Sequence, residues 1–153
     1  MKICYYTPFK PLSHAHPSGD LVTATGIFYY LKKQGHQVIP ASDLRCRWIY
    51  WKPWGWLKLL QETRRVVRQN SGNGMDLWLT YHSYYKAPDL LGAAAAKQMG
   101  IPYVIFQGIY STKRRRAWKT RPGFYLNRHS LCAARHIFTN KKIDLLNLKR
   151  LIQ

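Results

Sequence analysis

The stretch Lys2–Val38, KICYYTPFKPLSHAHPSGDLVTATGIFYYLKKQGHQV, decides the fold of this chain. It begins with a run of β-forming residues, Lys2–Thr7, and continues into a loop rich in proline, histidine and serine. Asp20–Gln34 then carries apolar residues at helical spacing, and Gly35 is placed to end this helix in a left-handed turn. A second strand is predicted at His36–Ile39. Strand, loop, helix and strand make one βαβ unit, which predicts a parallel sheet.

The rest of the chain continues the alternation of strands and helices. It predicts strands at Met75–Tyr81, Ile101–Gln107 and His136–Asn140, and helices at Trp56–Asn70, Pro88–Gln98, Gly123–Arg135 and Ile143–Leu151. Because the connections are short, we expect residues 1–153 to form a single α/β domain with a Rossmann-like, doubly wound parallel sheet. The strand order expected for this sheet is 3-2-1-4-5.

The charge of the chain is extreme, since 25 Lys and Arg oppose 6 Asp and Glu and give a formal net charge of +19. Such a field attracts nucleic acid, anionic lipid or phosphorylated substrates, although a solvated basic surface can also serve solubility alone. No stretch approaches the roughly 20 apolar residues needed to cross a bilayer. Cys4, Cys46 and Cys132 are far apart, which favours reduced thiols in a cytoplasmic protein, with Cys4 as a small core residue.

Basic and aromatic side chains alternate in Ala41–Gly55, and a second basic run lies in the loop Gly108–Thr120. Tryptophan prefers the boundary between water and lipid, while Lys and Arg meet anionic head groups. The same pattern suits stacking on single-stranded nucleic acid, or tryptophans that fold back onto the core. The candidate membrane-binding residues are Arg45, Arg47, Trp48, Trp51, Trp54, Lys113, Arg114, Arg115 and Arg116.

A candidate ligand site is expected at the carboxyl edge of the sheet, where open α/β sheets bind ligands. Ser18 or Asp20 can cap the first helix, and free N–H groups at its start can hold a hydroxyl-rich ligand. His14 and His16 lack a visible third ligand, so no metal site is expected. The candidate binding residues are His14, His16, Ser18, Gly19, Asp20, His82, Ser83, Tyr84, Gln107 and Gly108.

Several catalytic signatures are missing from the sequence. Neither G-x-G-x-x-G nor GxxxxGKS/T follows the first strand, which argues against NAD-dependent dehydrogenases and P-loop NTPases. Six carboxylates show no glycosidase-like pairing, and no G-x-S-x-G elbow is present. The residues of this chain alone therefore give no complete active site, and its catalytic residues stay unassigned.

Three short motifs carry a resemblance to a known family: PSGD at Pro17–Asp20, GHQV at Gly35–Val38 and FTN at Phe138–Asn140. The chain resembles the N-terminal domain of retaining nucleotide-sugar glycosyltransferases of the GT-B architecture, the family 4-like or "group 1" type. Asp20 stands where that family commonly has a second glycine, and Gln107 where it often has a histidine. Gln107 can hydrogen-bond a hydroxyl group but cannot take up a proton.

The resemblance implies that the chain is the acceptor-binding half of an enzyme. That enzyme would move a sugar from a nucleotide-sugar donor to a glycan or lipid-linked acceptor in cell-envelope polysaccharide synthesis. In the family the donor is held by a C-terminal domain. We expect this domain to be absent from residues 1–153, with the linker that leads to it beginning at Gln153. No cofactor is therefore expected in this chain, and it should be inactive alone.

The resemblance also implies a cytoplasmic protein that is peripheral on the inner membrane face, with the anionic membrane surface and the missing donor domain as partners. The ten candidate binding residues would then contact the acceptor. A basic α/β binding module for nucleic acid stays open as the alternative, because the net charge alone would suit it.

Overall fold

The computed structural model describes residues 1–152, so that Gln153, the expected start of a linker, lies outside the described residues. Every predicted strand and helix is present, with bounds shifted by at most a few residues. The elements are β1 (Lys2–Tyr6), α1 (Gly19–Lys33), β2 (Gln37–Pro40), η1 (Ile49–Trp51), α2 (Pro53–Asn70), β3 (Leu77–Ser83), α3 (Leu90–Met99), β4 (Tyr103–Gly108), η2 (Thr112–Arg115), α4 (Arg121–Ala133), β5 (His136–Phe138) and α5 (Lys142–Ile152).

The five strands form one parallel sheet in the order β2-β1-β3-β4-β5, which confirms the doubly wound α/β class. The expected order 3-2-1-4-5 is wrong, because β3 pairs with β1 and not with β2. The sequence of β3, LWLTYHS, is buried over almost its whole length and suits an interior position, whereas the half-exposed β2 suits an edge. The direction of winding therefore reverses between β1 and β3, which makes their carboxyl ends the switch point of the sheet.

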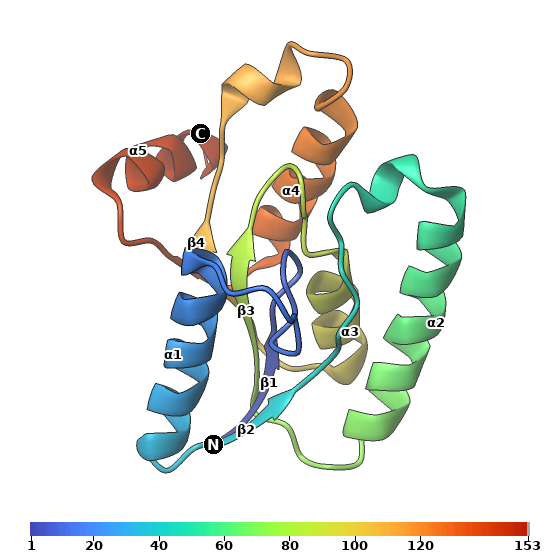
Figure 1. The fold of residues 1–153 in the computed structure, drawn as a ribbon, viewed down its shortest axis with the longest axis vertical. Coiled ribbons are helices and arrows are strands. Elements are labelled where there is room, and N and C mark those ends of the chain that lie inside the picture. Colours follow the sequence, from blue (N-terminus) through green and yellow to red (C-terminus); the bar gives the residue numbers. More distant parts are fainter. Residues whose placement is uncertain (153) are drawn as a thin grey trace.

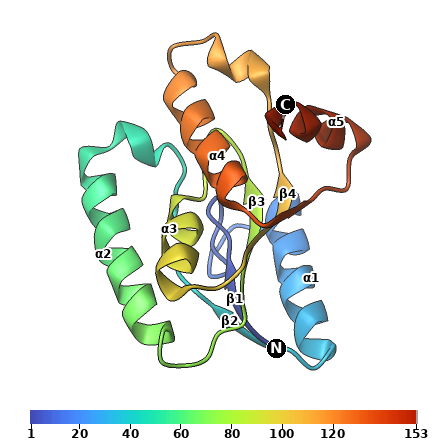
Figure 2. The same ribbon diagram turned by 180° about the vertical axis from the view of Figure 1, so that it is seen from behind.

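Helices cover both faces of the sheet. One face is covered by α1, whereas α2, α3 and α4 lie side by side on the other (Figures 1 and 2). Tyr5 packs with Phe28 under α1, while Cys4 and Tyr6 point to the opposite cluster around Trp78. Both faces of β1 are thus buried, which explains its continuous apolar run and confirms Cys4 as a core residue.

A buried polar network joins β3 and β4 to α3. The carboxylate of Asp89, the N-cap of α3, accepts hydrogen bonds from Gly92 N at 2.7 Å, from the Tyr103 hydroxyl at 2.8 Å and from the Thr80 hydroxyl. Burial raises the pKa of the Asp89 carboxyl, and these three donors oppose the rise. A Cβ on Gly92 would lie 2.2 Å from Asp89 Oδ2, so the network also requires glycine at that position.

The apolar residues of α2 do not all pack against the domain. Thr63 is buried, but Trp56 and Leu60 are exposed. The helix instead lies against η1 at Gly55, where a Cβ would come within 2.7 Å of Ile49 Cγ1. With Gly55 on the packed side, Trp54, Trp56, Leu57 and Leu60 are exposed, whereas Leu59 packs against the core.

Candidate functional site

Two neighbouring strands leave the extended conformation at the same level of the carboxyl edge. His82 of β3 has φ of 64° and Gln107 of β4 has φ of 66°, both in the left-handed region. They lie side by side, directly after the paired residues Tyr81 and Phe106. This conformation is unfavourable for residues with a side chain and persists where the surrounding structure enforces it, which happens most often at binding and catalytic sites.

The His82 ring is buried among aromatic side chains. It stacks on Tyr84 with ring centroids 4.8 Å apart, and it meets Phe9 and Tyr81 edge-on. Asp20 Oδ1 lies 3.3 Å from His82 Nδ1, but the two groups are not aligned for a hydrogen bond, and neither ring nitrogen has a hydrogen-bond partner. Buried polar atoms are normally paired, so these two nitrogens mark a place where a ligand or water would be bound.

A small hollow adjoins this ring at the switch point of the sheet. The loop after β1 contributes Thr7, Phe9 and Lys10, the first turn of α1 contributes Asp20, and β3 contributes Tyr81 and His82. Burial raises the pKa of the neighbouring Tyr84 to about 12, so its hydroxyl stays protonated at neutral pH. The hollow has a volume of about 10 Å³, which is room for about one water molecule or one hydroxyl group, and it combines hydrogen-bond donors and acceptors with aromatic walls.

The protonation of His82 gives a testable pH dependence. Burial lowers the pKa of His82 below its ordinary value of 6.5, opposed by Asp20 and Asp144 and assisted by Lys141. The unfolded chain therefore takes up a proton at a pH where the folded chain does not. This contribution to stability is complete above the ordinary pKa and is lost as the pH falls, with a slope of up to about 1.4 kcal/mol per pH unit.

We expect His82→Asn to remove this slope from urea unfolding curves recorded at successively lower pH. Asparagine is the appropriate substitute, because it tolerates the left-handed conformation. His129→Asn, at an exposed position of α4, serves as the matched control and should keep the wild-type slope. An unchanged slope in His82→Asn would show that the ring titrates as it does in the unfolded chain.

The candidate residues of the first loop have local structural roles. Ser18 is the N-cap of α1, since its Oγ accepts a hydrogen bond from Leu21 N at 3.3 Å, and Gly19 begins the helix. His14 Nδ1 accepts a hydrogen bond from His16 N at 3.2 Å. In the part of the chain that the structure describes, no three His, Cys, Asp or Glu side chains gather as metal ligands.

Ser83 and Gly108, which were also expected to contact a ligand, lie in the interior instead. Ser83 is fully buried and donates a hydrogen bond to Asn127 Oδ1 at 2.9 Å. A Cβ on Gly108 would lie 2.7 Å from Ile137 Cγ2, so this glycine permits close packing of β4 against β5.

Two segments far apart in the sequence meet in a basic aromatic surface. The ring centroids of Trp51 and Trp118 are 6.0 Å apart, and Trp51 Nε1 donates a hydrogen bond to Lys119 O at 3.2 Å. The exposed fractions of Trp54 and Trp118 are 75% and 69%. We define the basic aromatic surface by its exposed residues Trp51, Lys52, Trp54, Leu57, Lys58, Lys113, Arg114, Arg115, Arg116, Trp118 and Lys119.

The predicted tryptophans of this region divide into two groups. Trp48 is half-buried, has φ of 57°, and packs edge-on against Tyr50 and Tyr85. The alternative in which tryptophans fold back onto the domain therefore holds for Trp48. Trp51 and Trp54 are exposed, and a core-packing role does not explain them.

Sequence reasoning missed several residues of both regions. Phe9 and Lys10 line the hollow beside His82, and they could have been found because they follow the first strand within the loop already expected to bind. Trp118 stands among the basic residues of the second loop, the same pattern that singled out Trp51 and Trp54. Leu57 could not be found from the sequence, because it is exposed only through the orientation of α2 on the domain.

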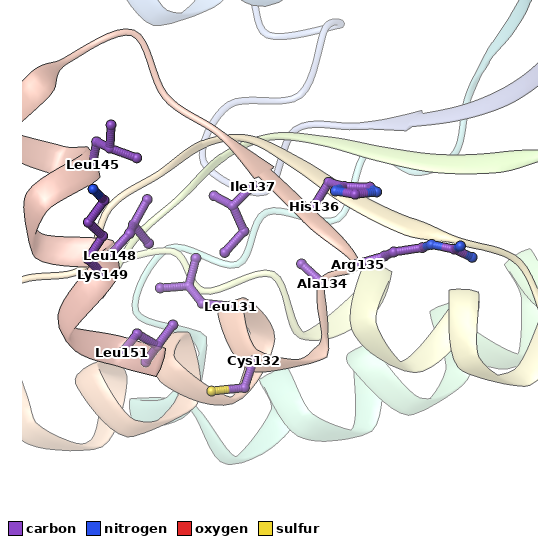
Figure 3. Close-up of a pocket in the computed structure, with 10 residues that line it drawn as sticks. All are labelled: Leu131, Cys132, Ala134, Arg135, His136, Ile137, Leu145, Leu148, Lys149 and Leu151. Carbon is purple, nitrogen blue, oxygen red and sulfur yellow. The ribbon is translucent and has the colours of Figure 1, made fainter. Parts of the chain in front are cut away.

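Another hollow of the structure is mostly apolar. A hollow of about 410 Å³ lies between α4, β5 and α5, and Leu131, Ile137, Leu148 and Leu151 are on its walls (Figure 3). Binding sites for polar ligands need several converging polar groups, and this wall is mostly aliphatic. We therefore place the candidate site at the switch point and not here.

The described residues thus define an α/β domain with a small polar hollow at the switch point of its sheet, which we call the crevice, and an adjoining basic aromatic surface. The crevice is lined by Thr7, Phe9, Lys10, Asp20, Tyr81 and His82. No helix within residues 1–152 has both the length and the apolar character needed to cross a membrane. No known protein-family model matches the chain, and no curated protein is significantly similar to it. The functional proposal accordingly rests on the geometry of the crevice and the surface.

Proposed function

We propose that this domain binds the acceptor of a nucleotide-sugar glycosyltransferase, as the N-terminal half of a retaining enzyme of GT-B architecture. The observation that carries the proposal is the pair His82 and Gln107, held side by side in left-handed conformations at the carboxyl edge of the sheet, with His82 next to the switch point. Both ring nitrogens of His82 lack a hydrogen-bond partner, and Nδ1 lies 3.3 Å from the carboxylate of Asp20. The hollow has room for one hydroxyl group of a ligand, which would pair with a ring nitrogen of His82 and donate a hydrogen bond to Asp20.

The charge of Asp20 supports an acceptor in this crevice and not a donor. A carboxylate beside the His82 ring repels the diphosphate of a nucleotide sugar, whereas it forms charge-assisted hydrogen bonds with sugar hydroxyls. The donor would then be held by a second domain, as in the family that the sequence resembles. On this proposal the isolated domain binds the acceptor, but transfer of the sugar requires the donor domain as well.

The basic aromatic surface supports attachment to a membrane. We infer that it holds the domain against the anionic inner face of the cytoplasmic membrane, where lipid-linked and envelope glycans are assembled. Seven exposed Lys and Arg accompany the tryptophans of the two segments: Lys52, Lys58, Lys113, Arg114, Arg115, Arg116 and Lys119. Each Lys or Arg near an anionic surface contributes about 1 kcal/mol, so a few of them suffice for reversible, salt-sensitive attachment.

Acceptor binding can be tested by nuclear magnetic resonance of the His82 ring. We expect soluble oligosaccharides that resemble envelope glycans to shift the ring signals, and nucleotide sugars to leave them unchanged. Asp20→Asn should weaken glycan binding about tenfold or more, because a hydrogen bond to a charged group contributes roughly 1.5–3 kcal/mol. Asp76→Asn is the matched control, since Asp76 accepts a hydrogen bond from Lys2 N at the opposite edge of the sheet.

Two outcomes would count against this proposal. If no glycan in a broad panel shifts the His82 signals, or if Asp20→Asn and Asp76→Asn bind a glycan equally well, the crevice is not an acceptor site. If nucleotide sugars bind there instead, the crevice belongs to the donor and the assignment of the domain is reversed.

A nucleic-acid module is the second candidate, favoured by the exposed Trp54 and Trp118 among basic side chains. Aromatic side chains beside a positive groove stack on single-stranded bases, with steep loss of affinity as salt rises. Binding of a single-stranded oligonucleotide that quenches tryptophan fluorescence would support this alternative. It would replace the glycosyltransferase proposal if the His82 ring responded to no sugar.

A further inference from the structure

A hollow that is larger than the crevice lies beside the basic aromatic surface. It has a volume of about 530 Å³, and its walls include Arg45, Arg47, Trp51, Trp54 and Lys58. This volume is within the range of small-molecule sites. Asp43 is also on its wall, but the cationic side chains outnumber this one carboxylate, and indole rings line the same hollow. The hollow therefore suits a ligand that has both an anionic and an apolar part.

One aromatic ring separates this hollow from the crevice. The guanidinium groups of Arg45 and Arg47 lie 5.9 Å and 5.8 Å from the centre of the Phe9 ring, and Arg45 Nε donates a hydrogen bond to Phe9 O at 3.0 Å. The same ring lies edge-on to His82 at 6.2 Å and to Tyr84 at 5.5 Å. The two arginines are therefore next to the crevice and also border the hollow that contains the exposed tryptophans.

Both guanidinium groups are available to an anion. Neither forms a salt bridge among residues 1–152, and the nearby Asp43 accepts its hydrogen bond from Ser13 Oγ at 2.8 Å. The cation–π contact with Phe9 orients both guanidinium groups and pairs neither of them with a carboxylate. Guanidinium donors form a planar fork that matches the oxygens of a phosphate group, and pre-orientation lowers the entropy that binding loses.

We infer that Arg45 and Arg47 bind the phosphate that links an acceptor sugar to its lipid. The sugar then lies over the crevice, with one hydroxyl group in the hollow beside His82, and the lipid chain runs along Trp51 and Trp54 toward the membrane. The substrate class is a lipid phosphate ester that carries a sugar. This inference rests on the proposed function, because it divides the acceptor among the crevice, the two arginines and the tryptophans.

Farnesyl phosphate is a suitable probe, because it has the lipid and the phosphate without the sugar. We expect it to bind at least tenfold more tightly than farnesol, as measured by isothermal titration and tryptophan fluorescence. The double variant Arg45→Gln/Arg47→Gln should bind both compounds equally. Arg64→Gln/Arg68→Gln, which removes the same charge from exposed positions of α2, should keep the tenfold preference. Circular dichroism would establish that both variants are folded.

The remaining outcomes test the phosphate site separately from the proposed sugar-binding crevice. Equal binding of farnesol and farnesyl phosphate to the wild-type chain, or an unchanged preference in Arg45→Gln/Arg47→Gln, would overturn the inference. Inorganic phosphate that competes as strongly as farnesyl phosphate would show a site for free anions and would overturn it as well. Asp20→Asn should leave farnesyl phosphate binding intact, so failure of the glycan test alone would reject the sugar crevice but not the phosphate site.

Discussion

Asp89→Ala is expected to destabilise the domain by about 3–5 kcal/mol. The substitution removes the N-cap of α3, which typically contributes about 1 kcal/mol. It also leaves the buried hydroxyl groups of Thr80 and Tyr103 without their acceptor, at roughly 1–3 kcal/mol for each group. The backbone N–H of Gly92 loses its acceptor at the same time. Few domains of this size would keep a wide margin of stability after such a loss.

Urea unfolding followed by circular dichroism measures this effect. Asp89→Asn keeps the shape and one carbonyl oxygen, so we expect a smaller loss than in the alanine variant. Asp76→Ala, at an exposed carboxylate, should cost about 1 kcal/mol or less. If Asp89→Ala were no more destabilising than Asp76→Ala, the network would not be a main support of the packing between β3, β4 and α3.

The double variant Trp54→Ala/Trp118→Ala is expected to lose about 100-fold in affinity for vesicles that contain anionic lipid. Both indoles are largely exposed in the domain, so removing them leaves the core intact. Transfer of each ring into the lipid interface would contribute about 1.5 kcal/mol, and the two contributions together correspond to roughly two powers of ten. Trp51 is kept in this variant, because its Nε1 hydrogen bond to Lys119 O joins the two segments of the surface.

Vesicle sedimentation of the whole chain measures this prediction. Tyr29→Ala/Tyr30→Ala is the matched control, since it removes two exposed aromatic rings from α1 and should leave binding unchanged. Raised salt should weaken binding of the wild-type chain, because the basic side chains act through screened charge. Equal affinities of the two double variants would exclude the basic aromatic surface as the site of membrane contact.

Local sequence signals predicted most of the fold. The βαβ pattern in Lys2–Val38 predicted β1, α1 and β2, and Gly35 adopts the expected left-handed conformation with φ of 81°. The capping role of Ser18 was one of two roles that its position allowed. These features depend on spacing and backbone preference within a few residues, which is why a single sequence contains enough information for them.

The candidate site was only partly predictable. The carboxyl edge of the sheet followed from the βαβ topology, so Asp20, His82 and Gln107 could be selected from their place in the chain. The left-handed conformations of His82 and Gln107 could not be predicted, since neither residue is a glycine or an asparagine. They result from the pairing of β3 with β4 and from the packing around the two strands.

The sequence by itself determined the α/β class, the order of elements along the chain, and the unusual density of positive charge and aromatic rings. Only the tertiary structure decided that β3 lies beside β1, because strand order depends on which buried faces pack together and not on local pattern. It also decided that Trp51 meets Trp118 and that Arg45 and Arg47 meet Phe9. Such contacts join residues that are distant in the chain, and they form only when the helices and loops pack against the sheet.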